Sequence, residues 1–82
     1  MQIKFTKSTE KELVNLDKNV SHRIFEKALQ LKDNPYGLGS QKLEGGQGYR
    51  IRIGDYRVVY TIDKVSKTVI ITKVGHRKEV YR

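Results

Sequence analysis

The feature that most limits how this chain can fold is a Gly-Asp pair between two stretches of alternating apolar and polar residues. Glycine at the first position of a two-residue turn readily adopts the positive φ that a type II′ β-hairpin requires. Gly54 and Asp55 therefore predict a hairpin between strands at about 49–53 and 56–63. The expected facing pairs are Ile53 with Tyr56, Arg52 with Arg57, Ile51 with Val58, and Arg50 with Val59.

A third alternating stretch at about 68–75 follows the hairpin and predicts a three-stranded antiparallel meander. A four- or five-residue connection would place Arg57 beside Val74 or Gly75. One face of the meander is apolar, and we expect helices to cover it. Its members are Tyr49, Ile51, Ile53, Tyr56, Val58, Tyr60 and Ile62. Arg50, Arg52 and Arg57 share the opposite, open face, which we call the arginine face.

The first half of the chain predicts one strand and two helices. Gln2 to Thr6 alternates like a short strand. Ser8 or Thr9 is the expected cap of a short helix, with Glu12 completing a capping box after Thr9. A second helix is expected from about 20 to 33, after a break at 17–19. Its apolar stripe comprises Ile24, Phe25, Ala28, Leu29 and Leu31.

The segment 36–48 holds five of the seven glycines, which predicts a loop with a short extended piece at 42–44. The predicted fold class is α+β: an N-terminal strand, an antiparallel helical hairpin and the meander, in one sheet with the helices on one face. At 82 residues, the chain is expected to form a single domain, 1–82.

Composition narrows the possible functions. Without Cys there can be no disulfide, thiolate metal site or cysteine nucleophile, and two histidines far apart in sequence predict no metal site. The apolar segments are too short for a signal peptide or a membrane span, so we expect a cytoplasmic protein with no membrane partner. Residues 1–48 carry 8 basic and 6 acidic groups, whereas residues 49–82 carry 9 basic and 3 acidic groups. This asymmetry favours an anionic partner for the C-terminal part.

Stability of the sheet alone would not favour the grouping of three arginines on the arginine face. Facing like charges cost up to about 1 kcal/mol in a sheet, although exposed basic residues also serve solubility. The tail that follows the third strand is expected to bring His76, Arg77 and Tyr81 towards the same surface. Arginines can clamp a phosphate, and His or Tyr can transfer protons or stack on a base.

Two segments carry a resemblance to the RelE/ParE toxin superfamily, and the Gly-His-Arg tail resembles its RelE branch. They are Tyr49-Arg-Ile-Arg-Ile-Gly-Asp-Tyr-Arg-Val-Val-Tyr60 and Lys73-Val-Gly-His-Arg-Lys-Glu-Val-Tyr81. The resemblance implies a toxin of a toxin–antitoxin pair that cleaves mRNA in the ribosomal A site. The RNA's own 2′-hydroxyl would attack the adjacent phosphate, with no metal or other cofactor.

By position, the resemblance implies that Arg57 and Arg77 stabilise the transition state and that Tyr81 is the C-terminal tyrosine. Arg50 and Arg52 match two basic strand positions that are lysines in the best-known RelE-type enzymes. A guanidinium is a poor proton acceptor, so we expect these two arginines to clamp RNA, together with Lys73 and Lys78. His76 then becomes the candidate acid or base, because histidine is the side chain that most readily exchanges protons near neutral pH.

The resemblance also implies a cognate antitoxin, RelB-like, acidic and partly disordered, whose charge suits the arginine face. The ribosome and mRNA are the other expected partners. Two alternatives remain at this point: a ParE-like inhibitor of DNA gyrase, and a basic RNA-binding module without catalysis.

Overall fold

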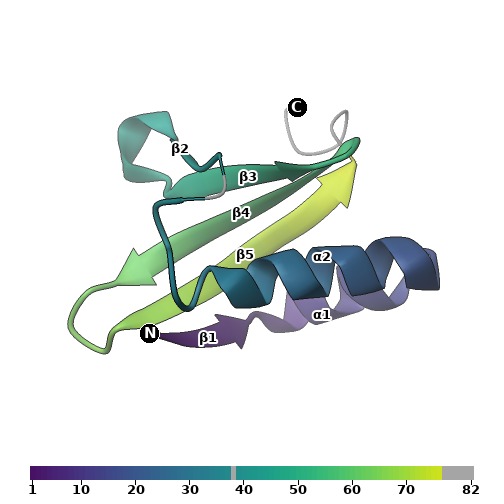
Figure 1. Ribbon diagram of the computed structural model, residues 1–82, viewed down its shortest axis with the longest axis horizontal. Helices are drawn as coiled ribbons and strands as arrows, with labels where there is room; N and C mark the ends of the chain where they lie inside the picture. The colour runs from purple at the N-terminus through teal and green to yellow at the C-terminus, as the bar shows by residue number, and fades with distance from the viewer. Residues whose placement is uncertain (38, 77–82) are drawn as a thin grey trace.

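The computed structural model describes residues 1–37 and 39–76, which form two helices and a five-stranded sheet (Figure 1). In chain order the elements are β1 (Gln2–Phe5), α1 (Lys7–Val14), α2 (Lys18–Gln30), β2 (Gln41–Lys42), a 3₁₀ turn (Glu44–Gly46), β3 (Tyr49–Ile53), β4 (Tyr56–Asp63) and β5 (Thr68–His76). The strand order is β1-β5-β4-β3-β2. The predicted α+β class, helical hairpin and meander are confirmed.

The β3–β4 hairpin has the register that the Gly-Asp turn predicts. Ile53 faces Tyr56, Arg52 faces Arg57, and Arg50 faces Val59. Gly54 has a φ of +61°, in the left-handed region that favours glycine and that the first turn position needs.

The β4–β5 pairing contains both of the predicted registers, separated by a bulge. Arg57 faces Gly75 and Val59 faces Lys73, but beyond the bulge Tyr60 faces Ile71. The extra residue is Thr72, whose hydroxyl donates to the Val59 carbonyl at 3.3 Å. Because a bulge shifts the alternation by one residue, it decides which side chains of β5 share a face with Arg57.

The edge of β5 is covered first by a strand and then by a helix. β1 pairs with β5 in parallel, from Gln2 with Thr68 to Phe5 with Ile71. The chain then enters α1, capped by Thr6, whose hydroxyl accepts from the Thr9 N–H at 3.2 Å. The expected caps, Ser8 and Thr9, are instead inside the helix. Thr9 is fully buried where α1 packs on β5, and its hydroxyl is satisfied there by donating to the Ile71 carbonyl at 3.0 Å.

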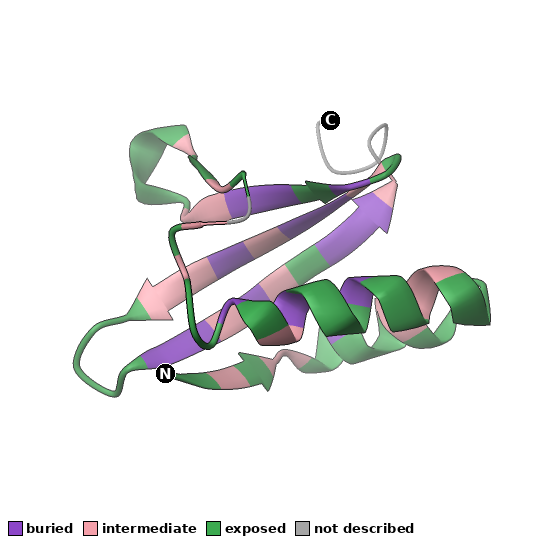
Figure 2. Ribbon diagram, viewed as in Figure 1, coloured by how far each residue is buried: buried purple, intermediate pink, exposed green. Residues whose placement is uncertain are grey.

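The second helix lies about two residues earlier than predicted. Its cap is Asp17, which accepts from the Asn19 N–H at 2.9 Å, so the expected break at 17–19 is a helix start. The core joins one side of α2 to the inner face of the sheet (Figure 2). Its buried members are Ile24, Ala28, Leu31, Ile51, Ile53, Val58, Tyr60, Val69, Ile71 and Val74. Among the described residues, no helix has the length and apolar character to cross a membrane.

Tyr60 fixes the glycine-rich loop to the sheet. Its fully buried hydroxyl lies 2.6 Å from the Pro35 carbonyl oxygen and 2.7 Å from the Ser40 Oγ. Burial raises the pKa of the phenol above its ordinary value of 10.0, and the hydrogen bond with Ser40 partly opposes this. A raised pKa means that the neutral phenol stabilises the fold fully below pH 10 and less as the pH rises further.

We expect Tyr60→Phe to lower the free energy of unfolding by about 1 to 2 kcal/mol, because it leaves two partly buried polar groups, the Pro35 carbonyl and the Ser40 hydroxyl, without this partner. Urea denaturation followed by circular dichroism measures the change. Tyr36→Phe is the matched control, since Tyr36 is 53% exposed. Equal stabilities of the two variants would contradict the anchoring role.

Candidate functional site

The arginine face is built from two neighbouring rows across β3, β4 and β5. One row runs from Arg52 through Arg57 to Gly75, and the next runs from Arg50 through Val59 to Lys73. Four cationic side chains therefore start from adjacent rows of one face. Gly75 has no side chain, so the position on β5 that faces Arg57 adds none to the arginine face.

Arg57 and Arg50 are buried, although we expected exposed side chains on this face. Arg57 is 4% exposed and Arg50 is 9% exposed, whereas Arg52 is exposed. Arg57 lies on a strand with neighbours on both sides, where flanking side chains shield it from water. An arginine that served only solubility would extend into solvent, so burial argues against that explanation for Arg50 and Arg57.

Arg50 is oriented by the neighbouring edge strand. β2 pairs with β3 so that Gln41 faces Arg50, and the Arg50 Nη2 donates to the Gln41 Oε1. The sequence placed the extended piece at 42–44, whereas β2 is Gln41–Lys42. Gln41 was missed as a site residue because a lone glutamine in a loop gives no sequence signal.

Lys73 lies at the border between the arginine face and α1. Its Nζ is 3.5 Å from the Glu12 Oε2, and its side chain is 48% exposed. The other oxygen of Glu12 accepts a hydrogen bond from the Val74 N–H at 3.0 Å. Glu12 thus continues the edge pairing of β5 after β1 has ended, a role different from the capping box that we predicted.

His76 does not join the arginines in the described part of the chain. It faces Tyr56 across the β4–β5 pairing, and the two rings meet edge to face with centroids 5.5 Å apart. Without the bulge at Thr72, the alternation would have put His76 on the side of Arg57. Arg77, Lys78 and Tyr81 lie outside the described residues.

Comparisons with known proteins agree on one family. Residues 3–81 match the family described as the ParE toxin of type II toxin–antitoxin systems, parDE. Toxin RelG of Mycobacterium tuberculosis is 30% identical over 82 residues, which cover 98% of this chain and 94% of that protein.

Solved structures show the same fold. The toxin–antitoxin complex RelBE2 of Mycobacterium tuberculosis contains a chain with a TM-score of 0.83 and 28% identity, covering 93% of this chain and 96% of that one. The archaeal RelE–RelB complex of Pyrococcus horikoshii gives a TM-score of 0.79 and 33% identity, covering 93% of each chain. The chain belongs to the RelE/ParE toxin superfamily.

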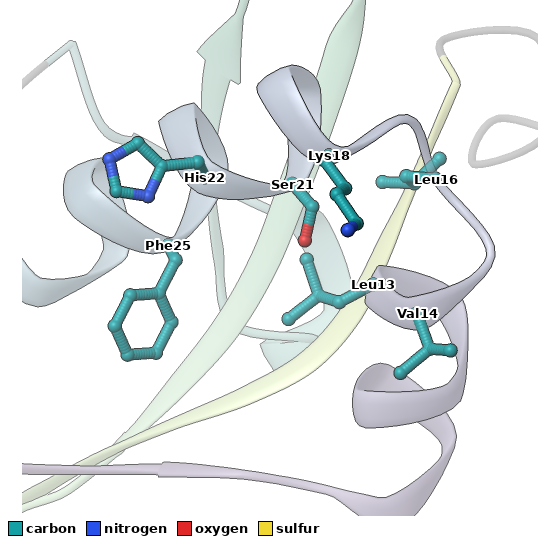
Figure 3. A pocket seen from close by; sticks show the side chains of 7 residues that line it. All are labelled: Leu13, Val14, Leu16, Lys18, Ser21, His22 and Phe25. Carbon is teal, nitrogen blue, oxygen red and sulfur yellow. The ribbon is translucent and has the colours of Figure 1, made fainter.

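This RelE/ParE-superfamily chain has a second surface that differs chemically from the arginine face. A groove of about 450 Å³ lies where α1 meets α2. Figure 3 shows Leu13 and Phe25 directed towards it, with His22 at its border. Val14 at its rim is 82% exposed. This groove is thus largely apolar, whereas the arginine face is cationic.

We expect Glu12→Ala to destabilise this toxin fold by about 1 kcal/mol, because the Val74 N–H loses its acceptor. Glu12→Gln keeps an acceptor oxygen and loses only the partly exposed ion pair with Lys73, so its effect should be smaller. Thermal unfolding of both variants measures the difference. If Glu12→Gln and Glu12→Ala lower the stability equally, the ion pair with Lys73, rather than the hydrogen bond with the Val74 N–H, is responsible for the effect.

Proposed function

We propose that this toxin is a ribosome-dependent endoribonuclease that cleaves mRNA in the ribosomal A site and so inhibits translation. The observation that carries the proposal is the placement of Arg57. Its guanidinium is held in the sheet, with Arg52 on the neighbouring strand and Gly75 on the other side. A shielded guanidinium interacts with a phosphate more strongly than one in bulk water, because less water screens the charge.

The reaction requires no atom from the protein. The 2′-oxygen forms a bond to the adjacent phosphorus and gives up its proton, and the bond from phosphorus to the 5′-oxygen breaks. The products are a 2′,3′-cyclic phosphate and a 5′-hydroxyl, which takes up a proton. The protein must align the attacking oxygen with the leaving oxygen and neutralise the charge that develops on the phosphate.

The arginines fit the second of these tasks. Arg57 is our candidate for the charge on the reacting phosphate, and Arg77 is assigned to the same role by the family resemblance. Arg50, fixed by Gln41, and the exposed Arg52 would clamp neighbouring phosphates. Lys73, in the same row as Arg50, would extend the clamp on β5, and Lys78 is a candidate for the same role.

Two candidates can carry the protons, His76 and Tyr81. The imidazole of His76 is held against Tyr56 at the end of β5, on the face opposite Arg57. It would reach a phosphate on the arginine face only around the end of the strand. Tyr81 is assigned by the family resemblance alone.

The cytoplasm is the compartment in which such a toxin would meet ribosomes, and an antitoxin would neutralise it there. The two solved structures named above, RelBE2 and the archaeal RelE–RelB, are toxin–antitoxin complexes. We propose a cognate antitoxin for this chain too, with acidic residues that meet the arginine face. A net charge of +8 supports such a partner.

We expect the wild-type toxin to create new mRNA 5′ ends during in-vitro translation, and Arg57→Met to lower the cleavage rate by about 10²- to 10³-fold. Mapping mRNA ends measures both. Met keeps most of the buried volume. Ala would leave a cavity at this position, because Arg57 is only 4% exposed.

Lys64→Met, which removes one charge from the exposed β4–β5 turn, is the control and should cleave like the wild type. Intact mRNA with normal translation would overturn the nuclease proposal. The matched family is described as a ParE toxin, which favours gyrase inhibition as the second candidate function. Loss of gyrase supercoiling activity together with intact mRNA would establish that alternative.

If His76 transfers a proton, His76→Gln should lower the cleavage rate by about 10² or more and remove one limb of the pH–rate profile. If Tyr81 carries the protons instead, Tyr81→Phe should show the larger loss and His76→Gln should retain the pH profile. Single-turnover cleavage of programmed ribosomes across a pH series separates these outcomes.

A further inference from the structure

We propose that a basic cleft between α2 and the β3–β4 turn binds RNA phosphates beside the arginine face. The cleft has a volume of about 240 Å³. Arg23, Glu26, Lys27 and Gln30 line it from α2, and residues 52–54 line it from the hairpin. The inference rests on RNA being the partner, as in the proposed function, and extends that contact to a surface that the family resemblance did not point to.

The two cations on α2 stand on the same side of the helix. Arg23 and Lys27 are four residues apart, and like charges at this spacing destabilise a helix. The nearby carboxylate of Glu26 is drawn to His22, with an Nε2 to Oε1 distance of 3.0 Å. Within the described part of the chain, neither Arg23 nor Lys27 forms an ion pair. Their charge therefore remains available to an external anion.

The hairpin turn brings the guanidinium of Arg23 close to β3. A Cβ at Gly54 would lie 3.4 Å from the Arg23 Nη2, an ordinary van der Waals distance, so the guanidinium lies directly beside the turn. The positive φ of Gly54 makes the turn, and the turn places this part of β3 beside the cation on α2.

Arg52 connects the cleft to the arginine face. It lines the cleft, is exposed, and faces Arg57 across the β3–β4 pairing. β2 pairs only with Tyr49 and Arg50, so β3 is the edge of the described sheet at Arg52. A sugar–phosphate chain held at Arg57 could continue past Arg52 into the cleft without crossing another strand.

The lining favours nucleic acid over an acidic protein segment. Protein docking sites usually centre on apolar or aromatic anchors, and Ile53 is the one apolar side chain among the lining residues. Isolated cations around a polar hollow instead suit phosphate oxygens, to which an arginine can donate two parallel hydrogen bonds.

The test compares the double variant Arg23→Gln/Lys27→Gln with Lys4→Gln/Lys64→Gln, which removes the same charge from exposed positions outside the cleft. Glutamine keeps a good helix propensity. The probe is a short, fluorescently labelled single-stranded 2′-O-methyl RNA, which lacks the attacking hydroxyl. Anisotropy titrations of the full chain over a range of NaCl concentrations give the affinity and its salt dependence.

We expect the cleft variant to bind roughly 10-fold more weakly at low salt, with a slope of log K against log salt reduced by about 1.4, or 0.7 for each lost phosphate contact. The control should keep the wild-type slope. A second arm measures co-sedimentation with 30S ribosomal subunits. A selective loss with the oligonucleotide identifies mRNA as the source of the phosphates, and a loss confined to the subunits identifies ribosomal RNA.

Equal behaviour of the two double variants in both arms would overturn the cleft proposal. A labelled acidic peptide can be titrated in the same way as the RNA. If the cleft variant loses affinity only for this peptide, the cleft proposal is also overturned. The nuclease proposal is tested separately. If mRNA stays intact during translation, that proposal is overturned, but the binding measurements still test the cleft.

Discussion

The two-residue turn at Gly54 and Asp55 is the constraint on which the arrangement of the sheet depends. Its positive φ fixes the β3–β4 register, and the register sets both faces at once. Ile51 and Val58 point into the core, while Arg52 and Arg57 face each other on the opposite side. A slip by one residue would bury the arginines under the helices and expose the apolar set, so the core and the cationic surface are specified together.

The burial of Arg57 and Arg50 makes an unfavourable contribution to the free energy of folding. Removing a guanidinium from water is unfavourable, and a second arginine on the neighbouring strand adds repulsion. The sheet tolerates this arrangement because its other face is densely packed: Val58, Tyr60, Val69 and Ile71 are all fully buried. The two buried guanidinium groups are thereby restricted in position, which is what the proposed role of Arg57 at the reacting phosphate requires.

The edge of β5 and the helical side of the molecule are held by backbone pairing and apolar packing rather than by charge. β1 covers the first part of the β5 edge, and side chains of α1 cover the rest through Thr9 and Glu12. The helices bury one side each and leave an apolar groove between them (Figure 3). The chain thus presents two separate surfaces, one cationic and one apolar.

Local patterns in the sequence determined the hairpin register, the three strands of the meander, the inward-facing apolar set and most of the α2 stripe. These features depend on turn chemistry and on periods of two or 3.6 residues, which act between near neighbours in the chain. Such patterns also carried the family resemblance.

Tertiary structure decided the parallel place of β1, the burial of Arg57, and the side chains that complete the β5 edge. It also decided the face of His76, because a single extra residue at Thr72 reverses the alternation of β5. Each of these depends on atoms brought together from distant parts of the chain, and no local pattern in either part encodes the contact.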